Sequence, residues 1–313
     1  MSDLPAFQTD GRWIRSQRGP KSPVDPRVPY GWFNEKERSP GGKVEEVSAI
    51  LLTNRECPYT CLMCDLWKHT SNQTVPIGTI PRQIEHALGH LSPAGHLKLY
   101  NSGSFFDPGA VPLKDYHDIA ALVSSFEQVL VESHTAFVNE SSVEFSKMIH
   151  GELQVAIGLE TVHPEILPAL NKGMDLEDFK RSVDFLRSHG ISSRAYILLR
   201  PPFLSEAEGI EWACRSMDFA FACGVDVCSI IPVRSGNGAL DKLALEGYFS
   251  QPSIRSLEQV LDYGIGLGKG LVFADLWDLE RFSTCERCFA ARKERLEQMN
   301  LTQEHLKPLS CSC

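Results

Sequence analysis

The sequence lacks the long apolar run that a membrane-spanning helix requires. No stretch of its 313 residues approaches the roughly 20 apolar residues that cross a bilayer, and residues 1 to 21 lack the apolar core of a secretion signal. An excess of positive charge is also missing: the formal net charge is -9, which argues against a surface broadly attractive to nucleic-acid backbones. No repeat or low-complexity tract is evident. These absences predict a soluble, cytoplasmic protein without membrane contacts, whose contacts with nucleic acid are local if it makes any.

The composition that remains is that of a folded globular protein. Charged residues make up 23% and hydrophobic residues 42%, which is close to globular averages, and the length suits one large α/β domain or two ordinary ones. Ten cysteines are present. In a reducing compartment they are better interpreted as metal ligands, core residues or reactive thiols than as a disulfide framework.

The chain divides into three parts by composition. Residues 1–44 are rich in proline, glycine and charge, which predicts an extended N-terminal arm with little regular structure. Residues 45–278 form the predicted core domain, and residues 279–313 form a small cysteine-rich module. The arm also contains the one locally basic segment, with Arg12, Arg15, Arg18, Lys21, Arg27, Lys36, Arg38 and Lys43.

Short β-branched runs alternate with longer amphipathic stretches from Val47 onward, which is typical of repeated strand-helix units. We expect helices between parallel strands, at 79–91, 112–126, 142–149, 175–189, 205–223 and 253–266. The predicted strands are 47–54, 96–103, 128–134, 153–161, 193–201 and 225–233, with a short one at 270–277. An open doubly wound sheet and a partial barrel share this pattern, and in both folds the chemistry gathers at the carboxyl ends of the strands.

Three cysteines, Cys57, Cys61 and Cys64, follow the first of these strands in the segment "TNRECPYTCLMCDLWK". Their spacing would suit one face of a core helix, but Pro58 and the poor helix formers after it favour a loop. Structural zinc usually takes four protein ligands in two pairs, so three thiolates from one loop are a poor zinc site. A 4Fe-4S cluster accepts this spacing, and three ligands leave one iron open to a substrate or cofactor.

This Cys-x3-Cys-x2-Cys loop after a first strand resembles the signature of the radical S-adenosylmethionine (SAM) superfamily. The resemblance implies a partial (β/α)6 barrel, a 4Fe-4S cluster and SAM as cofactor. It also implies reductive cleavage of SAM to methionine and a 5'-deoxyadenosyl radical that abstracts hydrogen from a substrate. A reductase, flavodoxin or ferredoxin would supply the electron.

Further cofactor contacts follow from the same resemblance. Met63 matches a position that packs near the adenine, and Ser102, Gly103 and Ser104 of "NSGS" stand where the family binds the methionyl amine, although the acidic residue of that segment is absent. Glu132 and Glu160, near strand ends, resemble polar cofactor contacts, with a helix cap or salt bridge as the alternative for Glu160.

Two arginines lie on the fifth predicted strand. A guanidinium group can bind a carboxylate through paired hydrogen bonds, so cofactor binding and a surface ion pair are the two interpretations. They are Arg194, which we include among the cofactor contacts, and Arg200.

The cysteine-rich module carries a CxxC pair, Cys285 and Cys288, and a CxC pair, Cys311 and Cys313, around a predicted helix at 289–299. Two close pairs of thiolates fit a closed tetrahedral site, so zinc is favoured and an auxiliary iron-sulfur cluster is the alternative. The remaining cysteines lie in apolar stretches and are predicted core residues: Cys214, Cys223 and Cys228.

The segments "YILLRPPFL" at 196–204 and "SIIPVRSGNGALDKL" at 229–243, with the terminal cysteines, narrow the resemblance. They resemble the branch that contains the archaeosine-biosynthesis radical enzyme, a relative of the Elongator catalytic subunit. That branch implies modification of a 7-deazaguanine base in transfer RNA (tRNA). We expect a radical SAM enzyme of tRNA modification; the alternatives are the same chemistry on a small metabolite, or a metal-stabilised scaffold or electron-transfer protein.

Overall fold

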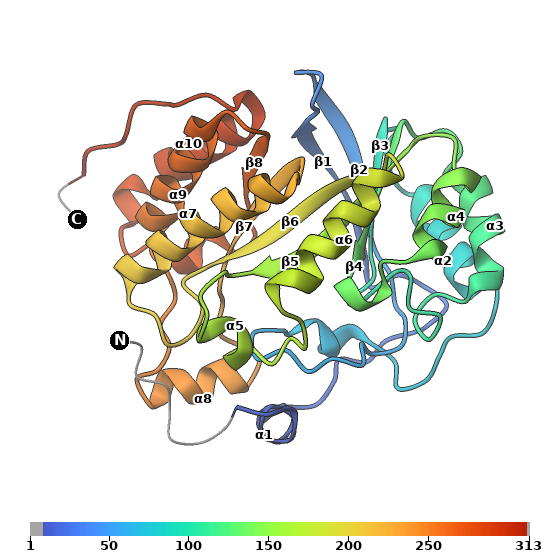
Figure 1. Ribbon diagram of the computed structural model, residues 1–313, viewed down its shortest axis with the longest axis horizontal. Coiled ribbons are helices and arrows are strands. Elements are labelled where there is room, and N and C mark those ends of the chain that lie inside the picture. The colour runs from blue at the N-terminus through green and yellow to red at the C-terminus, as the bar shows by residue number, and fades with distance from the viewer. Residues whose placement is uncertain (1–8, 312–313) are drawn as a thin grey trace.

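A computed structural model describes residues 9–311, and one curled β-sheet runs through it (Figure 1). The strands follow one another across the sheet in chain order, and all neighbours pair in parallel except β1 and β2. They are β1 Gly31–Arg38, β2 Val44–Leu51, β3 His96–Tyr100, β4 Gln128–Ser133, β5 Glu152–Glu160, β6 Ser192–Leu199, β7 Val227–Pro232 and β8 Leu271–Ala274. The sheet curls into a half-barrel, so the predicted fold class is confirmed.

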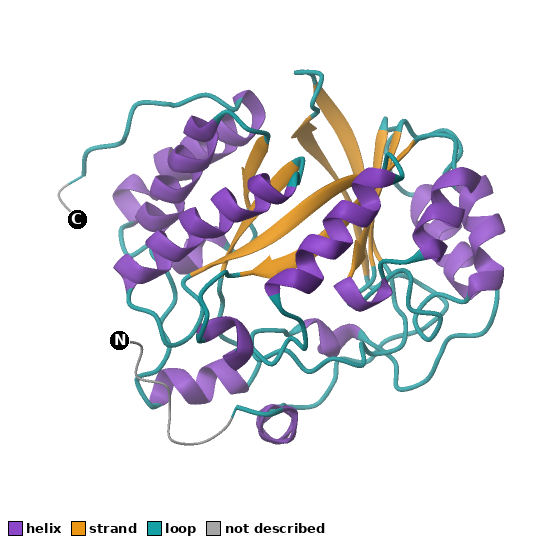
Figure 2. Cartoon of the chain, viewed as in Figure 1, coloured by secondary structure: helices purple, strands orange, loops and turns teal. Residues whose placement is uncertain are grey.

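Helices cover the outer side of the curl and close its edges (Figure 2). They are α1 Gly11–Gln17, α2 Thr79–Leu88, α3 Tyr116–Leu122, α4 Glu140–Met148, α5 Ile166–Ala169, α6 Leu176–Ser188, α7 Glu206–Cys223, α8 Ala239–Leu245, α9 Ile254–Leu267 and α10 Glu286–Thr302. All the predicted helices are present. Helices α6 and α7 begin at capping boxes, where Asp175 and Ser205 satisfy free backbone N–H groups. No described helix is both long and apolar enough to cross a membrane.

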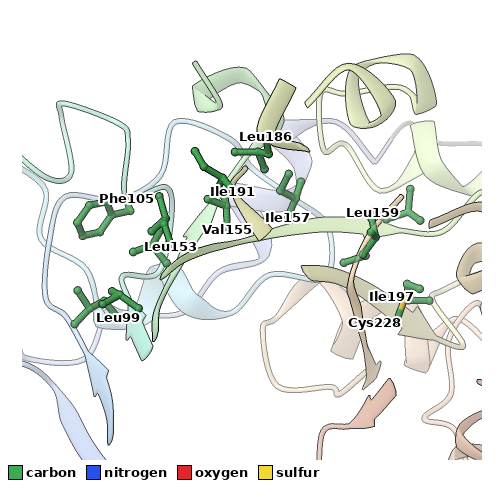
Figure 3. Packing of buried hydrophobic residues seen from close by; sticks show 14 of the residues in the cluster. Leu99, Phe105, Leu153, Val155, Ile157, Leu159, Leu186, Ile191, Ile197 and Cys228 are labelled. Atoms are coloured by element: carbon green, nitrogen blue, oxygen red, sulfur yellow. The ribbon is translucent and has the colours of Figure 1, made fainter. Parts of the chain in front are cut away.

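The main core lies between the sheet and these helices. Because side chains alternate along a strand, Val155, Ile157 and Leu159 of β5 share one face, where they pack with Leu186 of α6 (Figure 3). Cys223 and Cys228 belong to this core, and Cys214 packs against it, as predicted. The alternate face of β5 carries small and polar residues and faces the inside of the curl. A second apolar cluster joins α1, α5 and α8 at the carboxyl edge of the sheet.

The N-terminal segment is more regular than predicted. Residues 11–17 form α1 and residues 31–38 form β1, so the expectation of little regular structure is wrong for this part of the chain. Strand β1 pairs antiparallel with β2, which puts Glu35 and Glu37 within reach of the inner face. The division of the chain at residues 44 and 278 stays a prediction.

Candidate functional site

The three-cysteine loop lies at the carboxyl edge of the sheet and is held by the loops that follow β5 and β7. Asn171 donates from Nδ2 to the Thr60 carbonyl oxygen over 2.7 Å, and the Leu62 N–H donates to the Leu170 carbonyl over 2.9 Å. Asn237 donates from Nδ2 to the Leu62 carbonyl over 2.8 Å. Strand ends far apart in sequence therefore fix the backbone around Cys61.

An aromatic stack fixes the start of the same loop. The ring of Tyr59 stacks on His134, which follows β4, with 3.8 Å between the ring centroids. His134 donates from Nε2 to the Lys172 carbonyl oxygen over 3.0 Å. Burial and the nearby Lys172 charge lower the pKa of His134 to about 4, so the ring is neutral at pH 7. A neutral ring avoids placing a further buried charge beside the thiols.

The N-terminal segment clamps the loop from outside. Glu56, next to Cys57, accepts from Arg18 at 2.6 Å and from Lys21 at 2.7 Å. Arg15 donates from Nη1 to the Thr60 hydroxyl over 2.8 Å. Three residues of the predicted basic segment are thus engaged with the cysteine loop.

The three thiols are partly buried, which disfavours their charged form. Burial raises the pKa of Cys57 and Cys61 to about 11 and that of Cys64 to about 12. Backbone N–H groups oppose this rise, because those of Leu66 and Trp67 donate to the Cys64 sulfur. Without a metal the thiols keep their protons, so metal binding must release them.

The sulfurs of the loop are not grouped as closely as the ligands of a single zinc ion. Thiolates around one zinc ion lie about 4 Å apart, given Zn–S bonds of about 2.3 Å. Among the described residues, one group of three or more potential ligands has all its ligand atoms within 4.8 Å of one another, and it does not include Cys57, Cys61 or Cys64. The loop trio is therefore not packed as a closed single-ion site, and thiolates that hold separate corners of an iron-sulfur cube need no such close grouping.

The turn after β3 lies directly against the loop, and its predicted contact with the methionyl amine stays a prediction. A Cβ atom on Gly103 would lie 3.5 Å from Cβ of Cys57. Ser102 has a φ of 52°, a backbone conformation that residues other than glycine rarely adopt. Its hydroxyl oxygen lies 3.1 Å from the hydroxyl oxygen of Tyr30. The Ser104 hydroxyl already has a partner within the chain, because its Oγ accepts the His134 backbone N–H over 2.9 Å.

Both predicted carboxylates lie at the carboxyl ends of strands. Glu160 is 6% exposed, has a φ of 65°, and pairs with Lys172 through a 2.6 Å contact. The salt bridge weighed for Glu160 is therefore present. Glu132 accepts the Asn101 N–H over 3.3 Å, and burial raises the pKa of Glu132 to about 7.

Several buried polar atoms of this region have no partner within the described chain. They include both amide atoms of Asn101 and the hydroxyl of Tyr196 on β6. An unpaired buried polar group costs roughly 1–3 kcal/mol, so such groups are natural partners for a ligand. The donor set and the unpaired atoms together fit a polar cofactor held against the cysteine loop.

Arg194 and Met63 lie in other settings. Arg194 is held by Glu37, with contacts of 2.5 and 3.1 Å, and by Gln154 at 3.0 Å. It stands in register with Ala156, four positions before Glu160 on β5, so a contact with the cofactor stays a prediction and competes with this ion pair. Met63 is partly buried against the apolar cluster at the carboxyl edge, and its place near the adenine stays a prediction.

Sequence reasoning missed the residues that hold this loop. Asn237 lies within a quoted motif, but its spacing gives no sign that its amide reaches the loop. Lys172 and His134 carry no motif, and only the fold brings them next to the cysteines.

A second group of cysteines lies where the C-terminal segment returns to α10. The sulfurs of Cys285, Cys288 and Cys311 all lie within 4.8 Å of one another, with 3.9 Å between those of Cys285 and Cys311. Arg292 donates from Nε to the Cys288 sulfur over 3.3 Å. This geometry can hold a metal ion. The predicted fourth ligand, Cys313, lies outside the described residues.

The fold of the chain is similar to that of a solved enzyme structure. The chain superposes on methylornithine synthase with a TM-score of 0.51 and 13% identity over 87% of this chain and 77% of that one. This likeness shows the shared partial-barrel fold. No protein-family model matches the chain.

Two curated relatives are similar to the chain in sequence. An uncharacterised protein of Methanocaldococcus jannaschii is 25% identical over 288 residues, covering 84% of this chain and 79% of its own length. The archaeosine synthase subunit beta of Methanosarcina acetivorans is 27% identical over 215 residues, covering 64% of this chain and 60% of its own length. The predicted resemblance to radical SAM enzymes of the archaeosine branch is confirmed.

Proposed function

We propose that the chain is a radical SAM enzyme that binds a 4Fe-4S cluster through Cys57, Cys61 and Cys64. It cleaves SAM to a 5'-deoxyadenosyl radical that takes hydrogen from the substrate. The observation that carries the proposal is a three-thiol loop fixed over the carboxyl edge of a partial barrel of this fold. When bound, such a cluster supplies the electron for cleavage and leaves one iron open to the cofactor.

The chain's own residues would bind and orient the cofactor. The unpaired amide of Asn101 and the hydroxyl of Tyr196 can accept and donate hydrogen bonds to a polar ligand. The apolar core behind the strands holds these groups in place. The proposed cofactor contacts include those predicted from sequence: Met63, Ser102, Gly103, Ser104, Glu132, Glu160 and Arg194.

The test is SAM cleavage by the full chain after anaerobic reconstitution with iron and sulfide. With dithionite and SAM, the wild type is expected to form 5'-deoxyadenosine, and Cys61→Ala is expected to form none. Cys214→Ala is the matched control, because Cys214 lies on α7 and packs against the main core. If the assembled wild type yields no 5'-deoxyadenosine, a scaffold or electron-transfer role is favoured instead.

We propose a tRNA nucleobase as substrate, because one relative is named as an archaeosine synthase subunit. A small metabolite is the second candidate, favoured by the net charge of -9 and by the engagement of Arg15 and Arg18 with the cysteine loop. Adding tRNA should accelerate 5'-deoxyadenosine formation, and binding should weaken as salt rises. Arg12 is exposed, and Arg12→Ala leaves the contacts of Arg15 and Arg18 with the loop in place, so this variant tests RNA contacts. If the chain binds no tRNA at low salt, a small metabolite is the favoured substrate.

We also propose zinc at the C-terminal cysteines. The 3.9 Å between the Cys285 and Cys311 sulfurs matches thiolates around one tetrahedral ion. In anaerobic metal analysis, Cys285→Ala should lose zinc and keep its iron. A loss of roughly four iron atoms would instead indicate an auxiliary cluster. A cytoplasmic location, and a reductase, flavodoxin or ferredoxin as electron donor, complete the proposal.

A further inference from the structure

A lysine that belongs to no recognised motif is buried beneath the cysteine loop. Lys172 lies in the turn after α5 and is 8% exposed. Its ammonium group contacts Glu160 Oε1 at 2.6 Å. Burying this charge costs several kcal/mol unless partners compensate, so the fold must hold the pair in place.

Strand β5, which carries Glu160, also has the space for this ion pair, at Gly158. A Cβ atom on Gly158 would lie 2.5 Å from Nζ of Lys172 and 2.1 Å from Oε1 of Glu160. Both distances are shorter than real contacts allow, so any larger residue at this position would displace the pair from where it lies. Glu160 itself has a positive φ, which turns its side chain back toward Gly158.

The backbone around Lys172 is attached directly to the loop. The neighbouring Asn171 and Leu170 bond to Thr60 and Leu62 of the loop. The Lys172 carbonyl accepts from His134, whose ring stacks on Tyr59. These contacts fix the backbone of the turn that carries Lys172 relative to the cysteine loop.

The lysine lies in a segment that is bonded to the loop on both sides of Cys61. Asn171 and Leu170, which directly precede Lys172, bond to Thr60 and Leu62, so the chain that carries the lysine charge lies against that cysteine. A fixed cation stabilises negative charge on sulfur, and the same field stabilises the additional negative charge that a cluster takes up on reduction. Glu160 weakens this field because it carries the opposite charge.

We propose that the buried charge of Lys172 raises the reduction potential of the cluster held by Cys57, Cys61 and Cys64. Glu160 limits this rise because it carries the opposite charge. The inference rests on the proposed function, because it requires that cluster. It assigns the buried pair a role in electron uptake, beyond binding SAM.

The experiment is a redox titration of the reconstituted full chain without SAM, followed by the electron paramagnetic resonance signal of the reduced cluster. Lys172→Met is expected to lower the midpoint potential by a tenfold shift in the reduction equilibrium, which is about 59 mV for one electron. Lys172→Arg, which keeps the charge, should restore most of the wild-type value. Glu160→Gln should change the potential in the opposite direction, because it leaves the cation without its counter-charge.

Lys180→Met is the matched control, because Lys180 is exposed on α6. Equal potentials in wild type, Lys172→Met and Glu160→Gln, each with full iron, would overturn the inference and leave the proposed function standing. If Lys172→Met fails to assemble a cluster, the sign of the Glu160→Gln shift decides, and a fall would overturn the inference. A wild type that assembles no cluster would overturn both proposals.

Discussion

Glu132 is a partly buried carboxyl group on the inner face of the sheet, and its titration links the stability of the chain to pH. Burial raises its pKa to about 7, against the weaker opposing effects of the Asn101 N–H and the Lys172 charge. A glutamate in the unfolded chain titrates near about 4.3. Between these values the folded chain keeps a proton that the unfolded chain releases, so the free energy of unfolding falls as pH rises.

Replacing Glu132 with glutamine should therefore remove part of this pH dependence. In the metal-free protein we expect Glu132→Gln to be more stable than wild type at pH 8, by on the order of 2 kcal/mol, and nearly equal at pH 4.5. Urea unfolding followed by circular dichroism at several pH values measures the difference. Parallel stability curves for the two proteins would show that Glu132 is ionised in the folded state.

Single residues also mark the limit of what the sequence predicted. The cysteine loop was predictable because its spacing is local and Pro58 favours a loop. The contact between Glu160 and Lys172 was not, because it depends on a positive φ at one residue and a missing side chain at Gly158. Such contacts arise from the packing of distant segments, and no local pattern encodes them.

At the scale of elements, the core helices and strands followed from periodicity, whereas the N-terminal elements did not. Strand β1, "GWFNEKER", carries charges on the face that a strand would bury, which agreed with an extended arm of little regular structure. In the fold those charges are paired inside the curl, where Lys98 lies 2.7 Å from Glu35 and 2.5 Å from Glu37. Charge pairing across a sheet requires the partner strand, which local sequence does not reveal.

The N-terminal segment also gives a prediction about the cluster. Glu56→Gln leaves Arg18 and Lys21 without their shared carboxylate, and we expect faster loss of iron from the reconstituted protein. The rate of iron release to a chelator under anaerobic conditions measures this, with an expected increase of a few-fold. Asp25→Asn breaks an exposed ion pair with Arg27 in the same segment and should leave the rate unchanged. Equal rates for both variants would mean that the clamp does not stabilise the loop.

At the scale of the whole molecule, the half-barrel leaves two sheet edges, and α10 contacts the strands at both. Arg38 on β1 donates from Nη1 to the Leu301 carbonyl at the end of α10 over 3.2 Å. On β8, the Asn300 side chain donates to the Ala274 carbonyl and accepts its N–H, each over 2.9 Å. Gln303 does the same for Val272, with both bonds at 2.8 Å. Side-chain amides thus replace the missing neighbour strand and satisfy the edge.

Asn300→Ala should therefore open the edge at β8. It leaves two backbone groups of Ala274 without partners, which should lower the free energy of unfolding by about 1–3 kcal/mol. Hydrogen exchange followed by mass spectrometry should show faster exchange across residues 271–274, while β4 and β5 in the centre of the sheet keep their protection. Gln298→Ala, on the exposed side of the same helix, is the control and should change neither quantity. Unchanged exchange at β8 in Asn300→Ala would mean that the side-chain hydrogen bonds of Asn300 do not protect the β8 edge. The apolar contacts of α10 through Leu296 and Met299 would then hold this edge alone.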